Sequence, residues 1–230
     1  MSNTMPPPPP RISLTLIVAA TTKLGIGHAG GLPWPSLKSE MAYFRRVTKG
    51  PSSSTARNAV VMGRKTWDSI PPKFRPLEGR TNVVVSRSGN IQGMENGKEQ
   101  NGDVLVAKSL EHAVEILEGR DKSVTAGTKS EAEDSESLPP LGKVFVIGGS
   151  TVYASALKMP QTKRVLLTKI YKDYECDTFF PVDLEGEQGR KEGWVGKTWE
   201  DLERFVEVDV KEEKVKEGDV EFEFCLLERP

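Results

Sequence analysis

A carboxylate inside an apolar stripe is the first feature of the sequence that points to chemistry. The segment GLPWPSLKSEMAYFRRVT carries four residues at spacings of three and four, which predict one face of a helix: Leu37, Met41, Phe44 and Thr48. Glu40 lies within this stripe, directly before Met41. Because a buried carboxylate needs a partner, Glu40 either reaches solvent at the edge of the stripe or is the one polar group of an otherwise apolar pocket.

Residues suited to bind an anion follow four predicted strands. After the runs AVVM, NVVV, VLVA and VFVI come, in this order, Gly63-Arg64-Lys65-Thr66, Ser86-Arg87-Ser88, Lys108-Ser109 and Gly148-Gly149-Ser150-Thr151. Ligands of open parallel sheets bind beyond the carboxyl ends of the strands, where glycine lets a phosphate approach the backbone and a helix start offers free N–H groups. Each signal is weak alone, but four at one sheet edge favour a nucleotide with several phosphates. GRKT lacks the upstream glycine of a Walker motif, which argues against phosphoryl transfer, and IGGST is not the G-x-G-x-x-G fingerprint.

The elements that position these residues follow from an alternation along the chain. Apolar runs rich in β-branched residues recur as SLTLIVAA, NAVVMG, TNVVVSR, DVLVAKS, KVFVIGG and KRVLLTKIY, and helical patterns lie between several of them. This alternation predicts an α/β fold with a mainly parallel sheet covered by helices on both faces. The segment RFVEVDVKEEKVKEGDVEFEFCLLE holds two alternating runs around a polar turn, which predicts an antiparallel hairpin at the sheet edge.

Length and composition favour a single domain. In a chain of 230 residues we expect this domain over residues 11–230, after a disordered, proline-rich tail at residues 1–10. Residues 119–142 are rich in Ser, Glu and Asp, which predicts a low-complexity surface insertion. The net charge of -1 gives no broad field for nucleic acid or membrane, and two cysteines with two histidines are too few for a zinc site of usual spacing. The apolar run at residues 14–20 is too short to span a bilayer, so we expect a cytoplasmic protein without a metal.

These motifs together resemble dihydrofolate reductases of the eukaryotic, fungal-looking type. The resemblance rests on LIVAA, GIGHAGGLPWPSLKSEMAYF, VVMGRKTWDSIPPKFRPLEGR, VVVSRS, VFVIGGSTVY, LLTKI and CDTFFP, which occur in the order of that family. It implies an eight-stranded, mostly parallel sheet with an antiparallel C-terminal edge strand and helices on both faces. The implied activity is the NADPH-dependent reduction of 7,8-dihydrofolate to tetrahydrofolate, by hydride transfer to C6 and protonation at N5, in support of one-carbon metabolism. The resemblance also implies a monomer that binds antifolates such as methotrexate, with no need of nucleic acid or membrane.

The resemblance assigns roles to individual positions. Glu40 binds the pterin and assists protonation through water, Trp34 lies near this water, and Thr168 bonds the carboxylate. Arg80 pairs with the glutamate α-carboxylate, for which a planar guanidinium fork is suited. The remaining residues implied for the substrate are Ile17, Val18, Met41, Phe44, Ile70, Phe74, Leu77, Ile147 and Tyr153. Those implied for the cofactor are Ala19, Ile26, Gly27, Gly63, Arg64, Lys65, Thr66, Ser86, Arg87, Ser88, Lys108, Gly148, Gly149, Ser150, Thr151 and Val152, with Arg64, Ser86 and Arg87 at the 2′-phosphate.

Two other functions fit parts of the sequence. A pyrimidine reductase of riboflavin synthesis shares the general fold but does not need the LPW…E pocket or Arg80. A catalytically idle nucleotide-binding module would bind NADPH without turnover. Two positions also depart from the family pattern: Met41 stands where many relatives have an aromatic or other apolar residue, and Lys108 replaces an arginine.

Overall fold

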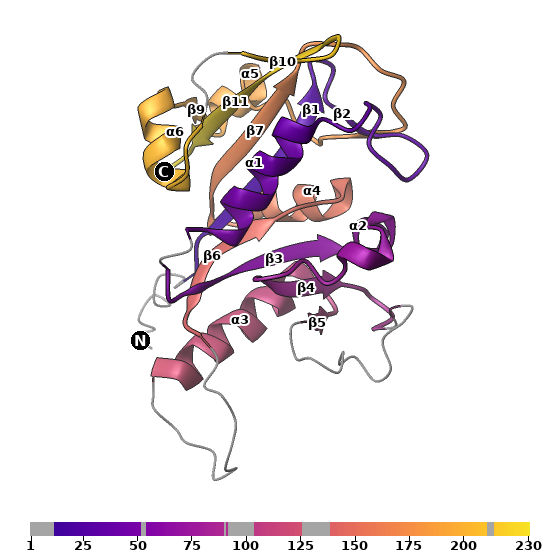
Figure 1. The fold of residues 1–230 in the computed structure, drawn as a ribbon. Helices are drawn as coiled ribbons and strands as arrows, with labels where there is room; N and C mark the ends of the chain where they lie inside the picture. The colour runs from indigo at the N-terminus through magenta and orange to yellow at the C-terminus, as the bar shows by residue number, and fades with distance from the viewer. Residues whose placement is uncertain (1–11, 52–53, 90, 92–103, 126–138, 211–213) are drawn as a thin grey trace, which may run out of the picture.

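A mixed β-sheet forms the centre of the structure, a computed structural model that describes residues 12–51, 54–89, 91, 104–125, 139–210 and 214–230 (Figure 1). The strands lie in the order β10-β11-β7-β1-β6-β3-β4-β5, and the short β9 pairs with β11 outside this path. Their bounds are β1 Leu14–Thr21, β3 Arg57–Gly63, β4 Thr81–Val85, β5 Val104–Ala107, β6 Leu141–Val146, β7 Thr162–Ile170, β9 Val195–Gly196, β10 Val215–Glu217 and β11 Val220–Glu228. Two further strands, β2 Gly25–Gly27 and β8 Thr178–Phe179, form a separate small sheet.

Strand direction in the large sheet agrees with the prediction. β1 pairs in parallel with β6 and β7, and β3 pairs in parallel with β4 and β6, whereas β11 runs antiparallel to β7 and β10. The inner strands are buried because apolar residues occupy nearly every position, as in the continuous run of β1. The expected mostly parallel sheet with an antiparallel C-terminal edge is therefore confirmed, and β9 adds a short strand that the sequence did not predict.

Helices cover both faces of the sheet, as the alternation predicted. Alternate residues of β1 point to opposite faces: Leu14, Leu16 and Val18 pack with apolar residues of α3 and α4, whereas Ile17 packs with those of α1, α2 and α6. The helices are α1 Lys38–Lys49, α2 Arg64–Ser69, α3 Leu110–Thr125, α4 Ser150–Lys158, α5 Glu187–Lys191 and α6 Trp199–Val206, with a 3-10 turn η1 at Pro72–Phe74. None of the helices in the described part of the chain is both long and apolar enough to cross a membrane.

A third buried cluster joins the segment before α1 to the C-terminal hairpin. It contains six residues and is called the hairpin cluster below: Trp34, Leu37, Ile170, Val215, Val220 and Phe222. The cluster brings the turn between β10 and β11 next to the start of α1, although the two segments lie at opposite ends of the sequence. It matters for the site because α1 carries Glu40.

Two predicted boundaries differ from the structure. The hairpin is present but begins at Val215, because the run RFV belongs to α6, whose buried Leu202 and Val206 are spaced by one helical turn. Helix α3 continues past Gly119 to Thr125, into the segment predicted as an insertion. Residues 126–138 of that segment and the tail at residues 1–10 lie outside the described residues, and the last two residues of the segment, Leu141 and Gly142, begin β6.

Candidate active site

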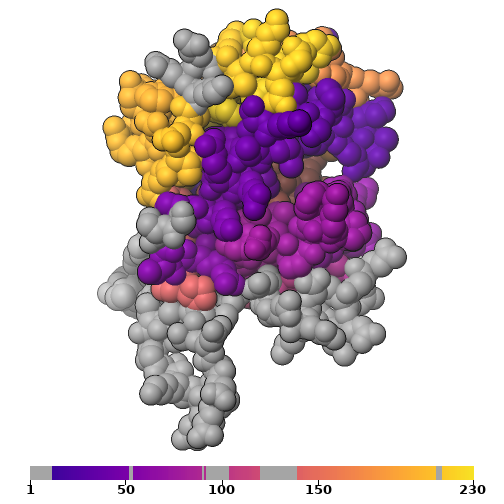
Figure 2. Space-filling view, in the orientation of Figure 1, coloured from indigo at the N-terminus to yellow at the C-terminus, as the bar shows by residue number. Residues whose placement is uncertain are grey.

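A long cleft runs along the carboxyl ends of the parallel strands, at the edge where the sequence predicted a nucleotide. Figure 2 shows the surface hollowed between the indigo segment, which holds the loop after β1, and the magenta segment, which holds α2. The cleft has a volume of about 2000 Å³. Pockets for one drug-sized ligand have roughly 300–1000 Å³, so this cleft has room for two ligands side by side.

Glu40 is a buried carboxyl group in the wall of this cleft. It lies in the first turn of α1, and its exposed fraction is 7%. Thr168 on β7 donates its hydroxyl hydrogen to Oε1 of Glu40 at 3.4 Å, which is long for a hydrogen bond between oxygens. Burial raises the pKa of Glu40 to about 7, against the smaller opposing effect of the Thr168 hydroxyl. Glu40 can therefore carry a proton near neutral pH.

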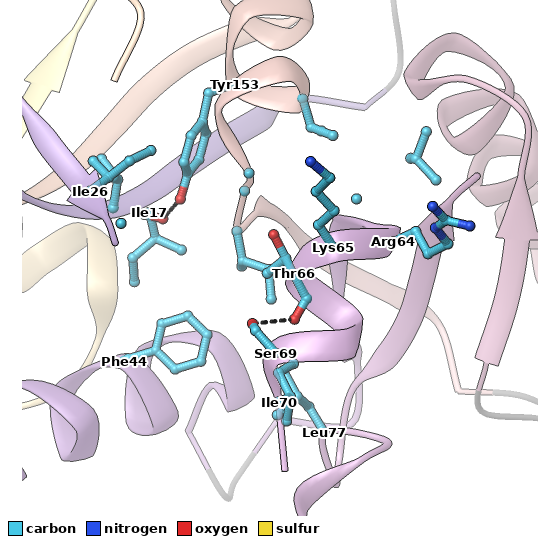
Figure 3. A pocket seen from close by; sticks show the side chains of 18 of the residues that line it. Ile17, Ile26, Phe44, Arg64, Lys65, Thr66, Ser69, Ile70, Leu77 and Tyr153 are labelled. Carbon is cyan, nitrogen blue, oxygen red and sulfur yellow. Dashed lines mark hydrogen bonds between the residues drawn. The ribbon is translucent and has the colours of Figure 1, made fainter. Parts of the chain in front are cut away.

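Apolar side chains line both sides of the cleft whose wall holds this carboxyl group. Figure 3 shows Ile17 and Phe44 facing Ile70 and Leu77 across the opening, and all four line the cleft. The hydroxyl of Tyr153 donates to the carbonyl oxygen of Ile17 at 2.7 Å, so this tyrosine is held by the strand instead of competing for Glu40. A cleft wall of this kind is suited to bind a flat, mainly apolar ligand that has polar atoms at one edge.

The sheet also fixes the helix that carries Glu40. Tyr43 stacks on Phe224 of β11 with ring centroids 3.9 Å apart, and Phe224 pairs with Thr168 in the register of β11 and β7. The same strand pair therefore places both the donor Thr168 and the ring that supports α1. Burial, with a smaller contribution from the charge of Glu40, raises the pKa of Tyr43 above its ordinary value, so Tyr43 stays neutral beside the carboxyl group.

Arg80 is a buried cation in the wall of the same cleft. Its exposed fraction is 4%, and its Nη1 donates to the Thr48 hydroxyl at 2.8 Å. Its Nε donates to the carbonyl oxygen of Glu78 at 3.2 Å, but none of the ion pairs between described residues includes Arg80. Burial, followed by the like charge of Arg45, lowers its pKa to about 10 against the smaller opposing effect of the Glu78 charge. A buried guanidinium without an anionic partner is unfavourable. Arg80 is therefore suited to receive a carboxylate from a ligand in the cleft.

The starts of α2 and α4 form a cradle for an anion. Gly63 and Gly149 are the cap residues of these helices, and neither start has a side-chain cap, so backbone N–H groups remain available. The two glycines lie close together: the N–H of Gly63 donates to the oxygen of Gly148 at 2.7 Å, and a cis peptide bond joins Gly148 to Gly149. A methyl group at Gly63 would meet Val152 at 3.2 Å, so a side chain there would narrow the cradle. Figure 3 shows Lys65, Thr66 and Arg64 at this side of the cleft.

Most of the predicted site residues meet in the cleft. All residues predicted for substrate or cofactor line it, and so does Glu40. Thr168 and Trp34 do not line the cleft. Thr168 is connected to it by its hydrogen bond to Glu40, and Trp34 is buried in the hairpin cluster with its ring edge-on to Tyr174. Met41 lies on the cleft wall with 46% exposure, whereas Tyr43 and Val47 occupy the buried face of α1. The apolar stripe is therefore divided: Met41 and Phe44 line the cleft together with Glu40, whereas Leu37 and Thr48 are buried.

Two sets of lining residues did not emerge from the sequence. The first is the cations Arg45, Arg46, Lys49 and Lys73, which line the cleft although the sequence pattern predicted no ligand contact for them. The second is the loop after β2, of which His28, Gly30, Gly31 and Leu32 line the cleft. Asp177, directly before β8, holds this loop: its N–H donates to the oxygen of Gly27 at 3.0 Å, and its carboxylate accepts from the N–H of Ala29 at 2.8 Å. The backbone bond from Ala29, followed by the Thr178 hydroxyl, lowers the pKa of Asp177. No spacing rule reveals a bond of this kind between segments so far apart.

Comparison with known proteins decides the family. The model of a family described as dihydrofolate reductase matches residues 13–188, which include Glu40, Arg80 and both glycine caps. The chain belongs to the dihydrofolate reductase family. The dihydrofolate reductase of Pneumocystis carinii is 40% identical over 220 residues, covering 94% of this chain and 97% of the relative. That of Schizosaccharomyces pombe is 37% identical over 228 residues, covering 93% of this chain but only 46% of the relative.

The fold agrees with a solved dihydrofolate reductase. The structure of the Schistosoma mansoni enzyme superposes with a TM-score of 0.66 at 31% identity, covering 95% of this chain and 99% of that chain. The predicted resemblance to eukaryotic dihydrofolate reductases is therefore confirmed. Residues 189–230, which include α6 and the C-terminal hairpin, lie beyond the part that the family model matches.

Proposed function

We propose that this chain reduces 7,8-dihydrofolate to 5,6,7,8-tetrahydrofolate with NADPH. The observation that carries the proposal is the carboxyl group of Glu40, buried in an apolar cleft with a pKa of about 7. Reduction of the N5–C6 double bond requires a hydride at C6 and a proton at N5. A lone carboxyl group that is protonated near neutral pH can donate this proton through water and recover it from solvent.

Arg80 would select the other end of the substrate. Dihydrofolate carries a flat pterin at one end and a glutamate at the other. Since Glu40 and Arg80 both line the cleft, the pterin would bind at the carboxyl group and the α-carboxylate at the buried guanidinium. Phe74 and Leu77 lie on the wall and would contact the benzoyl part between them. The two charged groups thus give the substrate one orientation.

The free N–H groups at the starts of α2 and α4 fit a pyrophosphate. Lys65 and Thr66 follow one glycine cap, and Ser150 and Thr151 follow the other. Arg64, Ser86 and Arg87 line the cleft after neighbouring strands and would surround the 2′-phosphate, which favours NADPH over NADH. When bound, NADPH supplies the hydride. The protein would contribute placement of the two ligands and exclusion of water.

Loss of NADPH absorbance with dihydrofolate tests this function. We expect turnover that methotrexate blocks, with tetrahydrofolate as the product in equal amount to the NADPH consumed. Binding of NADPH without turnover would contradict the proposal and favour a nucleotide-binding module, while reduction of a pyrimidine substrate instead would favour the riboflavin-pathway reaction. Cytoplasmic location and a monomeric state stay predictions, which fractionation and sedimentation would test.

A further inference from the structure

The start of α1 is capped by a residue from the other end of the chain. Leu37 occupies the cap position and offers no side-chain hydrogen bond. Instead, Glu217 accepts from the backbone N–H of Lys38 at 2.5 Å with Oε1 and from that of Ser39 at 2.9 Å with Oε2. The first N–H groups of a helix have no partner within the helix, so this carboxylate satisfies two of them.

Packing of the hairpin fixes Glu217 in this position. Glu217 ends β10 opposite Val220, next to the turn at Gly218, whose φ of 62° is in the left-handed region. Val215, Val220 and Phe222 on both sides of the turn are buried in the hairpin cluster together with Leu37. The residue before α1 and the strands that carry Glu217 therefore share one core.

Glu217 sits where it can act on Glu40. Lys38 and Ser39 are the first two residues of α1, and Glu40 is the third. The carboxylate of Glu217 fixes the backbone of the turn that carries Glu40. It also places a negative charge at the end of the helix whose partial positive charge favours an ionised Glu40. The first effect would hold Glu40 in position, and the second would add a small increase to the pKa that burial already raises.

We propose that Glu217 is a positioning residue for Glu40, which holds the first turn of α1 and makes Glu40 easier to protonate. The inference rests on the proposed reduction of dihydrofolate and extends it to a residue outside the part of the chain that the family model matches. It assigns a role in the reaction to the C-terminal hairpin, which does not line the cleft.

Titratable groups on neighbouring elements also face Glu40 and Glu217. Glu40 faces the Thr168 hydroxyl on β7, Tyr43 on its own helix and Tyr153 on α4, and burial raises the pKa of both tyrosines above their ordinary values. The backbone bond from Ser39 contributes most to the lowered pKa of Glu217. The backbone bond from Lys38, the Ser39 hydroxyl and the charge of Lys38 lower it further, against the opposing effect of burial. Elsewhere on the hairpin, Asp219 pairs with Lys172, and Glu221 pairs with Lys214 at 3.1 Å.

The variant Glu217→Gln tests the charge, with Glu221→Gln as a matched control on the same hairpin. Glu217→Gln keeps one oxygen acceptor but removes the negative charge, so the pKa of Glu40 falls by a few tenths of a pH unit, as for charges at helix ends. We expect kcat/KM for dihydrofolate near that of the wild type at pH 5 and roughly two- to fivefold lower at pH 9. Glu221→Gln should leave the profile unchanged.

Glu217→Ala tests the position of the helix start. It should lower kcat at every pH while KM for NADPH stays the same, and Glu217→Gln should restore most of the loss at low pH. If the pH profile of kcat/KM has the same midpoint in Glu217→Gln as in the wild type, the inference is overturned, even if the variant unfolds more easily. The carboxyl carbon of Glu40 can also be titrated by NMR in the ligand-free protein. A wild type without reductase activity would overturn the proposed function, whereas an unmoved Glu40 titration in Glu217→Gln would overturn this inference.

Discussion

The hydroxyl of Thr168 donates to Oε1 of Glu40 at 3.4 Å, and this bond favours the ionised form of a carboxyl group that burial keeps protonated. Thr168→Val removes the donor but keeps the branched shape that suits a strand. We expect the pKa of Glu40 to rise by a few tenths to about one pH unit, less than a short bond to a charged group would give. The midpoint of the pH profile of kcat/KM should move to higher pH by the same amount.

Thr162→Val on the same strand is the control for Thr168→Val. Thr162 is also buried, and its hydroxyl donates to the carbonyl oxygen of Ala156, away from the cleft. The control should change stability without moving the midpoint. A midpoint that shifts equally in both variants, or shifts to lower pH in Thr168→Val, would contradict the role of this bond.

Glu40 should reduce the stability of the ligand-free protein at alkaline pH. Its folded-state pKa of about 7 lies above the ordinary 4.5, so the unfolded chain ionises first as pH rises. Below pH 4.5 the carboxyl group is protonated in both the folded and the unfolded state, so its burial costs no ionisation free energy. The full loss of stability is reached only above the folded-state pKa of about 7. We expect Glu40→Gln to raise the free energy of unfolding by up to about 3 kcal/mol at pH 8 relative to its effect at pH 4. Urea unfolding at both pH values measures this, and equal effects at both would show that burial does not raise the pKa.

Arg80→Lys should weaken binding of dihydrofolate and leave NADPH binding unchanged. Lysine keeps the charge but lacks the planar fork that pairs with a carboxylate through two bonds. Losing one charge-assisted hydrogen bond of about 1.5–3 kcal/mol raises Kd by roughly ten- to a hundredfold. The control is a substrate analogue that ends at the benzoate and lacks the glutamate. Wild type and variant should bind this analogue equally, and a loss as large as that for dihydrofolate would place Arg80 elsewhere in recognition.

The Arg64→Ala, Arg87→Ala double variant should lose most of the preference for NADPH over NADH. Both arginines line the cleft and are exposed, so their contribution to cofactor binding depends on the 2′-phosphate that they would contact. Two charged hydrogen bonds give about a hundredfold preference or more. Cofactor titration should show weaker NADPH binding with NADH binding nearly unchanged. Equal weakening of both cofactors would assign the arginines to the shared pyrophosphate.

Much of the fold was predictable because parallel strands are buried on both faces. Runs such as VVM and VFVI are apolar at every position, which distinguishes them from surface elements. Helix α6 was missed because RFVEV alternates like a strand over a few residues. A signal was present upstream: Thr198 accepts from the N–H of Asp201, and the T-x-x-D spacing of TWED is typical of a helix start.

Two parts of the site were predictable from the sequence: the residues that follow strand ends and the carboxylate within an apolar stripe. Gly63 and Gly149 follow apolar runs, and Glu40 interrupts an apolar stripe, so each has a local pattern around it. Asp177 and Glu217 have none, because they bind backbone N–H groups of segments far away in the sequence. A backbone donor carries no residue identity, so only the folded structure reveals such a partner.

The pH dependence of kcat/KM for dihydrofolate in the wild type and in Glu40→Gln tests the proton-donor role of Glu40 most directly, because this parameter reports groups of the free enzyme. The wild-type value should be level at low pH, reach half of that level at the Glu40 pKa of about 7, and then fall about tenfold per pH unit. Glu40→Gln should be lower by roughly 100- to 10,000-fold at pH 6, should lack this midpoint and should still bind NADPH. A Glu40→Gln protein that keeps near-normal kcat/KM with the wild-type midpoint would contradict the account.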